Sequence, residues 1–316
     1  MIPAYNPSKE YLEQTLKSVL AQDAGPEQMQ IEVVDDCSPD VDVAAMVREI
    51  AGDRVKVSQT PKNLGLAGCW NTCIERARGE WVHILHQDDL VLPGFYQELC
   101  TGMKSGENIG AAFTRHAFID QDGHLCWLSE INCVNPGVPE NWLERLGVMQ
   151  LIQTPSIVVK RSVYEALGGF RSDLCYTLDW EMWLRIATRY SFWFEPQILA
   201  QYRVHQSSET SRLVLTAADT RDIRRMLGMT KSYQEPRLVS KVSRLAHVRY
   251  ADVAVHNARR MLVLGYAQSA WKQLMEALRF SKAPHMWGQV ASFYFLWGRL
   301  LGARLKRRLK NSFKTY

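Results

Sequence analysis

The chain has 316 residues, of which 47% are hydrophobic and 22% charged. This composition is typical of soluble globular proteins, and the length is sufficient for one large domain or two smaller ones. No run of about 20 apolar residues could span a bilayer, and no signal peptide is recognisable. The seven cysteines include no Cys-x-x-Cys pair, which disfavours a disulfide framework and structural zinc and favours a reducing cytosol.

Strand and helix patterns alternate through the first hundred residues. Apolar runs at 31–34, 54–58 and 81–85 predict strands, and the segments between them carry apolar residues at helical spacing. This alternation predicts an α/β fold with a mostly parallel, Rossmann-like sheet flanked by helices. The run at 81–85 has little polar alternation, so we expect an interior strand of that sheet, buried on both faces.

Two of these strands end in paired carboxylates, Asp35-Asp36 and Asp88-Asp89. Ligands of open α/β sheets bind outside the carboxyl ends of the strands, and carboxylates together with substrate phosphates commonly hold Mg²⁺ or Mn²⁺. Two structural alternatives exist. Asp35 and Asp36 could cap their own turn, and Asp88 and Asp89 could simply precede a helix N-terminus, where acids are favourable.

Short motifs along the chain resemble, in order, those of family 2 glycosyltransferases. They are Pro3-Ala4-Tyr5-Asn6, Val33-Val34-Asp35-Asp36-Cys37-Ser38, Asn63-x-Gly65, Asn71, Arg78-Gly79-Glu80-Trp81, His86-Gln87-Asp88-Asp89, Arg161-Ser162 with Gly168-Gly169-Phe170, Leu178-Asp179-Trp180-Glu181 and Tyr202-Arg203-Val204-His205. The resemblance covers about the first two thirds of the chain. It implies a GT-A fold and an inverting, metal-dependent transferase that uses a nucleotide-diphosphate sugar. The acceptor would be a glycan or a lipid-linked molecule of cell-envelope polysaccharide synthesis.

The resemblance also implies roles for individual residues. Donor-nucleotide binding falls on Pro3, Tyr5, Asn6, Asp36, Asn63 and Asp88. Asp89 would hold Mg²⁺ or Mn²⁺, and His205 would be a further metal contact or phosphate neighbour, with a purely structural role as an equal alternative. Asp179 would be the general base for the acceptor hydroxyl, with helix capping as its alternative.

Three features around these motifs bear on the site. Only Met1 and Ile2 precede Pro3, so we expect the first strand of the family to be shortened or absent. Leu178 stands where the family commonly has an acid. Glu181 lies two residues beyond Asp179 and would therefore face another side of a helix, away from its apolar side.

Beyond residue 211 every pattern is helical. We therefore expect a catalytic domain over 1–211 and an all-helical region over 212–316, in which 247–278 has the small-residue spacing of one tetratricopeptide-like helix pair. From Arg299 onward there are seven Lys and Arg residues and no acid. The aromatic stretch before them indicates an interfacial helix on an anionic membrane surface. This would make the protein cytoplasmic, or peripheral on the cytoplasmic face of the membrane.

Two other classes of function can be compared with this hypothesis. A dinucleotide-dependent dehydrogenase would need a Gly-x-Gly-x-x-Gly turn after its first strand, which Pro3-Ala4-Tyr5-Asn6-Pro7 does not supply. A non-catalytic adaptor acting through the helical C-terminal region would need neither Asp89 nor Asp179. No recognisable DNA- or RNA-binding module is present, so we expect no nucleic-acid partner.

Overall fold

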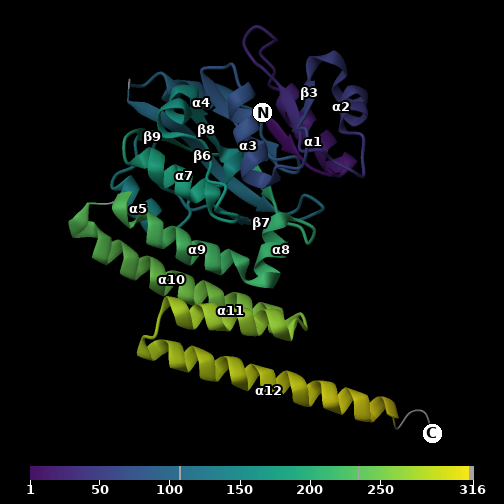
Figure 1. Cartoon of the computed structure of the whole chain (residues 1–316), viewed down its shortest axis with the longest axis vertical. Coiled ribbons are helices and arrows are strands. Elements are labelled where there is room, and N and C mark those ends of the chain that lie inside the picture. The colour runs from purple at the N-terminus through teal and green to yellow at the C-terminus, as the bar shows by residue number, and fades with distance from the viewer. Residues whose placement is uncertain (107, 234, 313–316) are drawn as a thin grey trace. The chain divides into compact units, whose positions relative to one another are not determined.

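The computed structural model describes residues 1–106, 108–233 and 235–312. It divides into two compact units, Met1–His205 and Gln206–Tyr316, and every strand of Figure 1 belongs to the first of them. The division lies six residues before the predicted boundary at 211. The intervening residues are mostly Ser, Thr and Gln, whose pattern carries no apolar periodicity.

The first unit begins with a parallel sheet of the order β1-β2-β3. Its strands are β1 (Ile2–Ala4), β2 (Glu32–Asp35) and β3 (Lys56–Gln59), and the helices between them are α1 (Lys9–Leu20) and α2 (Val43–Ala51). Leu12, Leu16, Val33 and Val47 are fully buried between these layers. The first strand, whose presence the sequence left open, is therefore formed, and it places Tyr5 beside the end of β2.

A second, mixed sheet follows, with the order β4-β8-β6-β9-β5 and β7 paired to β6. Its strands are β4 (Trp81–His83), β5 (Leu90–Val91), β6 (Ile109–Ile119), β7 (Leu125–Leu128), β8 (Ile157–Lys160) and β9 (Ser191–Arg203). Strands β6 and β9 pair in parallel, and the other neighbours pair antiparallel. The α/β class is confirmed, with uniformly parallel pairing confined to the first sheet.

The prediction that 81–85 is an interior strand of a parallel sheet is wrong in its pairing, because β4 runs antiparallel to β8. Its burial is as expected, since Val82, Ile84 and Leu85 are buried. An apolar run indicates that both faces of a strand are buried. It does not indicate whether the neighbouring strand is parallel or antiparallel. The Met1 N-terminus donates to the His83 carbonyl (2.9 Å), and Leu85 N–H donates to the Met1 carbonyl (3.0 Å). These bonds bring the segment after β4 alongside β1.

Five further helices complete the first unit. They are α3 (Gly65–Arg76), α4 (Phe95–Met103), α5 (Trp142–Val148), α6 (Arg161–Leu167) and α7 (Leu178–Ala187). Glu181 of α7 is completely buried, contrary to the expectation that it faces away from the apolar side. Arg185 explains this burial, because its guanidinium donates to both Glu181 oxygens (3.0 and 2.9 Å) and also to the Leu167 and Gly169 carbonyls.

The second unit is helical throughout its described residues. Its helices are α8 (Glu209–Thr216), α9 (Ala218–Met229), α10 (Pro236–Val263), α11 (Ala267–Phe280) and α12 (Pro284–Ser312). Ala251, Ala254, Ala270 and Ala277 are completely buried, which lets α10 and α11 approach closely and confirms the helix pair predicted over 247–278. No described helix is long and apolar enough to cross a membrane. Of the predicted basic tail, Lys314 and the side chains from residue 303 onward lie outside the described residues.

Asn71 of α3 links that helix to the turn after α6. Its Nδ2 donates to the Phe170 carbonyl (2.9 Å), and the Phe170 N–H donates to its Oδ1 (2.7 Å). The approach requires glycine at position 169, where a Cβ would lie 2.2 Å from Asn71 Oδ1. One side chain thus connects α3 to the segment that leads into α7.

We predict that Asn71→Ala lowers the free energy of unfolding by roughly 2 kcal/mol, because it removes two hydrogen bonds and leaves both backbone groups of the buried Phe170 without their partner. Urea denaturation measures this change. Asn135→Ala, at an exposed position, is the matched control and should be nearly neutral. Equal stability of the two variants would contradict the proposed link.

Candidate active site

The acids at the end of β2 have different partners. Asp36 Oδ1 accepts from Thr60 Oγ1 (3.0 Å) and Leu64 N–H (2.8 Å), and its Oδ2 accepts from Gly65 N–H (2.9 Å). Asp35 instead accepts from Ser38 and Gln59 side chains (2.6 and 2.8 Å). The turn-capping alternative therefore describes Asp35, whereas Asp36 holds the loop that begins α3. Its predicted bond to a nucleotide base stays a prediction.

The residues after β1 present an exposed aromatic ring on a fixed backbone. The Gln87 amide binds the Tyr5 peptide on both sides, accepting from its N–H (2.8 Å) and donating to its carbonyl (3.2 Å). Asn6 has a left-handed backbone (φ 43°), and its side chain donates to Asp40 (2.6 Å). The Tyr5 side chain is 45% exposed. Among the other predicted nucleotide contacts, Pro3 is buried in β1 and Asn63 is exposed ahead of α3.

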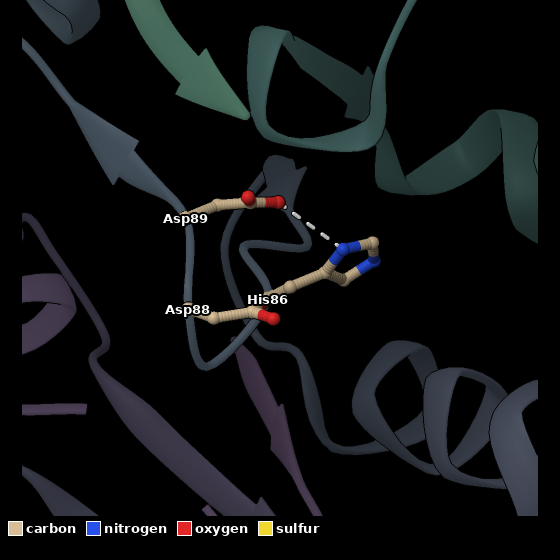
Figure 2. A group of neighbouring side chains, drawn as sticks. All are labelled: His86, Asp88 and Asp89. Carbon is tan, nitrogen blue, oxygen red and sulfur yellow. Dashed lines mark ion pairs between the residues drawn. The ribbon is translucent and has the colours of Figure 1, made fainter. Parts of the chain in front are cut away.

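His86, Asp88 and Asp89 come together in the turn between β4 and β5. Their ligand atoms all lie within 4.8 Å of one another, and Figure 2 shows the His86 ring directed toward the Asp89 carboxylate. Asp89 is 1% exposed. Its Oδ1 accepts from Arg203 N–H (2.8 Å), and its Oδ2 lies 3.2 Å from His86 Nδ1. Asp89 begins no helix, since β5 follows it directly, so the helix N-terminus alternative does not apply.

This cluster fits a divalent cation. Asp89 Oδ2 is buried and faces His86 Nδ1 without a well-aligned hydrogen bond, and a buried carboxylate oxygen is costly unless a charge compensates it. Burial, together with the Asp88 charge, raises the pKa of Asp89, against the opposing effect of His86. Burial lowers the pKa of His86, but the Asp89 and Asp88 carboxylates outweigh it and raise that pKa overall. Two carboxylates and an imidazole are a donor set that suits Mn²⁺ and is compatible with Mg²⁺.

His205 lies beside Asp88 instead of Asp89. Its Nε2 is 2.8 Å from Asp88 Oδ2, and its ring lies 5.4 Å from that of Tyr11. The structure thus brings both predicted metal residues to one site, but His86 occupies the place next to Asp89. The sequence contained the signal for His86, which stands two residues before Asp88 in the same motif. The predicted metal role of His205 is not decided by this geometry.

Arg203, for which the sequence indicated no role, fastens the Asp88-Asp89 turn. It is 2% exposed. Its Nε donates to the Asp88 carbonyl (2.9 Å) and its Nη2 to Gln14 Oε1 (2.6 Å). Its guanidinium lies 4.5 Å from the centre of the Tyr11 ring, and its Nη1 donates to the carbonyls of Asp120 and Gln121. Local spacing along the sequence does not reveal this role, because the hydrogen-bond partners of Arg203 are 82 to 189 residues away.

Asp179 is the second residue of α7, and the N-cap of that helix is Thr177. The capping alternative for Asp179 is therefore wrong. Gln150 Nε2 donates to Asp179 Oδ2 (2.8 Å), and Trp180 N–H donates to Oδ1 (2.7 Å). Burial raises the pKa of Asp179 to about 6, and the charge of His86 opposes this rise. The charge of His86 opposes the rise in pKa of both Asp89 and Asp179.

Relatives and solved structures similar to this chain include the following four proteins. The Mycobacterium tuberculosis protein MT1568 is 28% identical over 72% of this chain and 73% of its own length. The succinoglycan biosynthesis protein ExoO of Rhizobium meliloti is 37% identical over 29% of this chain and 26% of its own.

Both structures contain a nucleotide-diphosphate sugar. S. aureus TarS with UDP-GlcNAc has a TM-score of 0.65 at 16% identity, covering 88% of this chain and 79% of TarS. The mannosyltransferase PcManGT of Pyrobaculum calidifontis, with GDP-Man and Mn²⁺, has a TM-score of 0.57 at 18% identity, covering 93% and 78%. At this identity the likeness concerns the fold alone, and it confirms the expected GT-A fold.

The family comparison agrees with the order of motifs and with the geometry at the strand ends. The sequence model described as "Glycosyl transferase family 2" matches residues 1–168, which is more than half of the 316 residues. The chain therefore belongs to glycosyl transferase family 2.

Proposed function

We propose that the protein is an inverting glycosyltransferase that moves a sugar from a nucleotide-diphosphate sugar to a hydroxyl of a glycan or lipid-linked glycan. The observation that carries this proposal is the cluster of His86, Asp88 and the buried Asp89, whose ligand atoms lie within 4.8 Å of one another. The carboxylate of Asp179 acts electrostatically on His86 of this cluster. The nucleotide-diphosphate sugars in the two similar structures support the donor class. The partial relative ExoO, named for succinoglycan biosynthesis, supports a polysaccharide acceptor.

The donor nucleotide would lie over the ends of β1 and β2. Tyr5 would cover the base with its exposed ring, held in place by Gln87. Asp36 would fix the loop around Asn63, and one of its lone pairs could still accept from a base N–H. Asn6 and Pro3 would shape the floor of this site, and Asp88 would accept from the ribose.

Asp89 and Asp88, with His86, would hold Mg²⁺ or Mn²⁺, and the Mn²⁺ in one similar structure supports this assignment. When bound, such an ion supplies positive charge against the diphosphate leaving group. His205 would then contact the ion or a phosphate from its place on Asp88. The Arg203 N–H keeps Asp89 Oδ1 occupied, so that Oδ2 is the oxygen directed at the site.

Asp179 would accept the proton of the acceptor hydroxyl as that oxygen attacks the sugar. Gln150 and the Trp180 N–H orient its two oxygens. Glu181 is committed to Arg185, so α7 offers one carboxylate to the acceptor. A single base without an enzyme nucleophile corresponds to direct displacement, which inverts the configuration at the sugar.

The acceptor would approach over the segment between Asp120 and Gln150. At the start of this segment, the Asp120 carbonyl accepts from Arg203, which also binds the Asp88-Asp89 turn. At its end, Gln150 donates to Asp179. Exposed apolar side chains lie between these anchors, among them Trp127 (52%) and Val134 (85%). A cytoplasmic location, peripheral at a membrane that carries the acceptor, belongs to the same proposal.

We predict that Asp89→Asn abolishes metal-dependent binding and hydrolysis of nucleotide-diphosphate sugars. The amide oxygen can still accept from Arg203 N–H, so the fold is retained while the negative charge is removed. Calorimetric titration of UDP and GDP with and without Mn²⁺ measures the effect. Asp122→Ala is the control, because Asp120, Asp122 and His124 form the other described group of candidate ligands. A fully active Asp89→Asn variant would exclude the proposed metal site, and a wild-type protein without metal-dependent nucleotide binding would favour an adaptor.

Asp179 and Glu181 should be separable by substitution. We predict that Asp179→Asn lowers acceptor-dependent turnover by roughly 10² to 10⁴, as expected for loss of a general base, with donor affinity nearly unchanged. Glu181→Gln should mainly lower stability, by about 3 kcal/mol, because it leaves the Arg185 charge without its buried partner. Turnover at saturating donor, together with urea unfolding, distinguishes the two. An inactive but stable Glu181→Gln variant alongside an active Asp179→Asn variant would reverse the assigned roles.

The raised pKa of Asp179 predicts a pH dependence of turnover. A base acts only when deprotonated, so a carboxyl with a pKa of about 6 should give an ascending limb centred near pH 6, instead of near the ordinary value of about 4. Below it the rate should fall about tenfold per pH unit. Turnover at saturating donor and Mn²⁺ between pH 5 and 8 tests this, and a flat profile would contradict it. Asp179→Asn should lack the limb.

A further inference from the structure

Helix α12 exposes an apolar stripe about a quarter turn away from the face that makes its packing contacts. Met286 and Phe293 are completely buried, and the Gln289 side chain accepts from Arg259 of α10 (2.5 Å), so one face of α12 packs within the second unit. Trp287, Tyr294 and Leu301 recur every seven residues on another face, with 60%, 47% and 54% of their surfaces exposed. Residues with this spacing lie on one side of a helix.

Two further aromatic residues widen the stripe. Phe295 is 69% exposed, and Trp271 of α11 is 41% exposed. The Trp271 ring lies 6.4 Å from that of Tyr294, so neighbouring helices contribute to one surface. We call Trp271, Trp287, Tyr294, Phe295 and Leu301 the α12 stripe. Tryptophan and tyrosine are the residues that proteins concentrate at the membrane–water interface.

The charge of α12 is the second, independent observation. Between residues 284 and 312 the sequence contains no Asp or Glu and six Lys or Arg residues, all from Arg299 onward. Arg299 is exposed, and its guanidinium lies 6.0 Å from the centre of the Phe295 ring. Apolar side chains thus adjoin positive charge with no acid on the same helix to neutralise it.

We propose that the α12 stripe docks on an anionic lipid bilayer, with its apolar side chains among the acyl chains and Arg299 at the headgroups. A helix with aromatic and aliphatic residues on one face and Lys and Arg beside them has the properties of an interfacial helix. An apolar protein partner would cover the stripe but would leave the six bases uncompensated, whereas phosphate headgroups compensate them.

This inference goes beyond the transfer chemistry, and it rests on the proposed function only where it concerns the acceptor. An enzyme held at a bilayer meets lipid-linked acceptors at high local concentration, while its nucleotide-sugar donor arrives from solution. The docking surface therefore favours the lipid-linked acceptor over a free glycan. Hydrolysis of a soluble donor should not require the membrane.

The test is cosedimentation of the full chain with vesicles of phosphatidylcholine, with and without phosphatidylglycerol. We expect binding to the anionic vesicles at low salt and loss of binding as salt rises. Trp287→Ser with Phe295→Ser should weaken it at least tenfold. Arg307→Glu with Arg308→Glu should weaken it by a similar factor or more, since each base adds about 1 kcal/mol near an anionic surface, or about fivefold in affinity.

Leu245→Ser, at an exposed leucine of α10, is the matched control and should bind vesicles like the wild type. Hydrolysis of the donor should be equal in all these variants. This separates failure of the docking proposal from failure of the proposed function. Absence of wild-type binding to anionic vesicles at low salt, or unchanged binding by the Trp287→Ser/Phe295→Ser variant, would overturn the inference. Conversion of a dimer to a monomer by that variant would show that a second copy covers the stripe instead.

Discussion

Negative charge at the strand ends is the constraint on which the rest of the first unit depends. Asp35, Asp36, Asp88, Asp89 and Asp179 are all largely removed from solvent, and a buried carboxylate is costly unless donors or opposite charges meet it. The protein compensates these acids to different degrees. Asp35 and Asp36 are surrounded by hydroxyl, amide and backbone donors. Asp89 and Asp179 have fewer hydrogen-bond donors, and the charge of His86 stabilises the ionised form of both. The incompletely compensated acids are the ones assigned to the reaction.

Arg203 shows how this arrangement is held. A single buried guanidinium binds backbone carbonyls on two sides of the site, at Asp88 and at Asp120, and also reaches α1 through Gln14. The backbone N–H of Arg203 donates to one oxygen of Asp89. Such a planar group with five donors can join several segments in one fixed geometry, which lysine cannot do. The Asp88-Asp89 turn is therefore attached both to α1 and to the segment at Asp120, although it is only a short connection between β4 and β5.

Much of this organisation follows from local sequence. The features that local sequence does not predict have one physical cause in common. Acids directly after apolar runs indicated the rim of the sheet. Asp122-Gly123 is a dipeptide typical of hairpin turns, and it lies between β6 and β7, in which Phe118 pairs with Trp127. The direction of β4 was not predictable, because burial on both faces is the same beside a parallel and an antiparallel neighbour.

The remaining differences concern long-range partners. Glu181 was expected to face away, since its burial depends on Arg185 one turn later, which binds both the Glu181 carboxylate and the backbone carbonyls at 167–169. The sequence indicated His205 as the histidine of the metal site, but His86 is the one beside Asp89. Side-chain packing places it there, since the His86 ring stacks on that of Trp70 at 4.9 Å. Spacing along the chain places residues on an edge but does not decide which of two nearby imidazoles meets which carboxylate.

The same electrostatics connect function to stability. Asp179 has a pKa of about 6 in the folded protein against about 4 in an unfolded chain, so between these values the folded state binds more protons. The stabilisation from this group is thus fully present below about pH 4 and is lost as pH rises through 6. Asp89 acts in the same direction, because burial and Asp88 raise its pKa too. At neutral pH the site is therefore a source of instability that a bound cation would relieve, since a ligand that binds only the folded state stabilises it. Readiness to bind a cation and reduced stability without one are, in this site, two consequences of the same buried carboxylates.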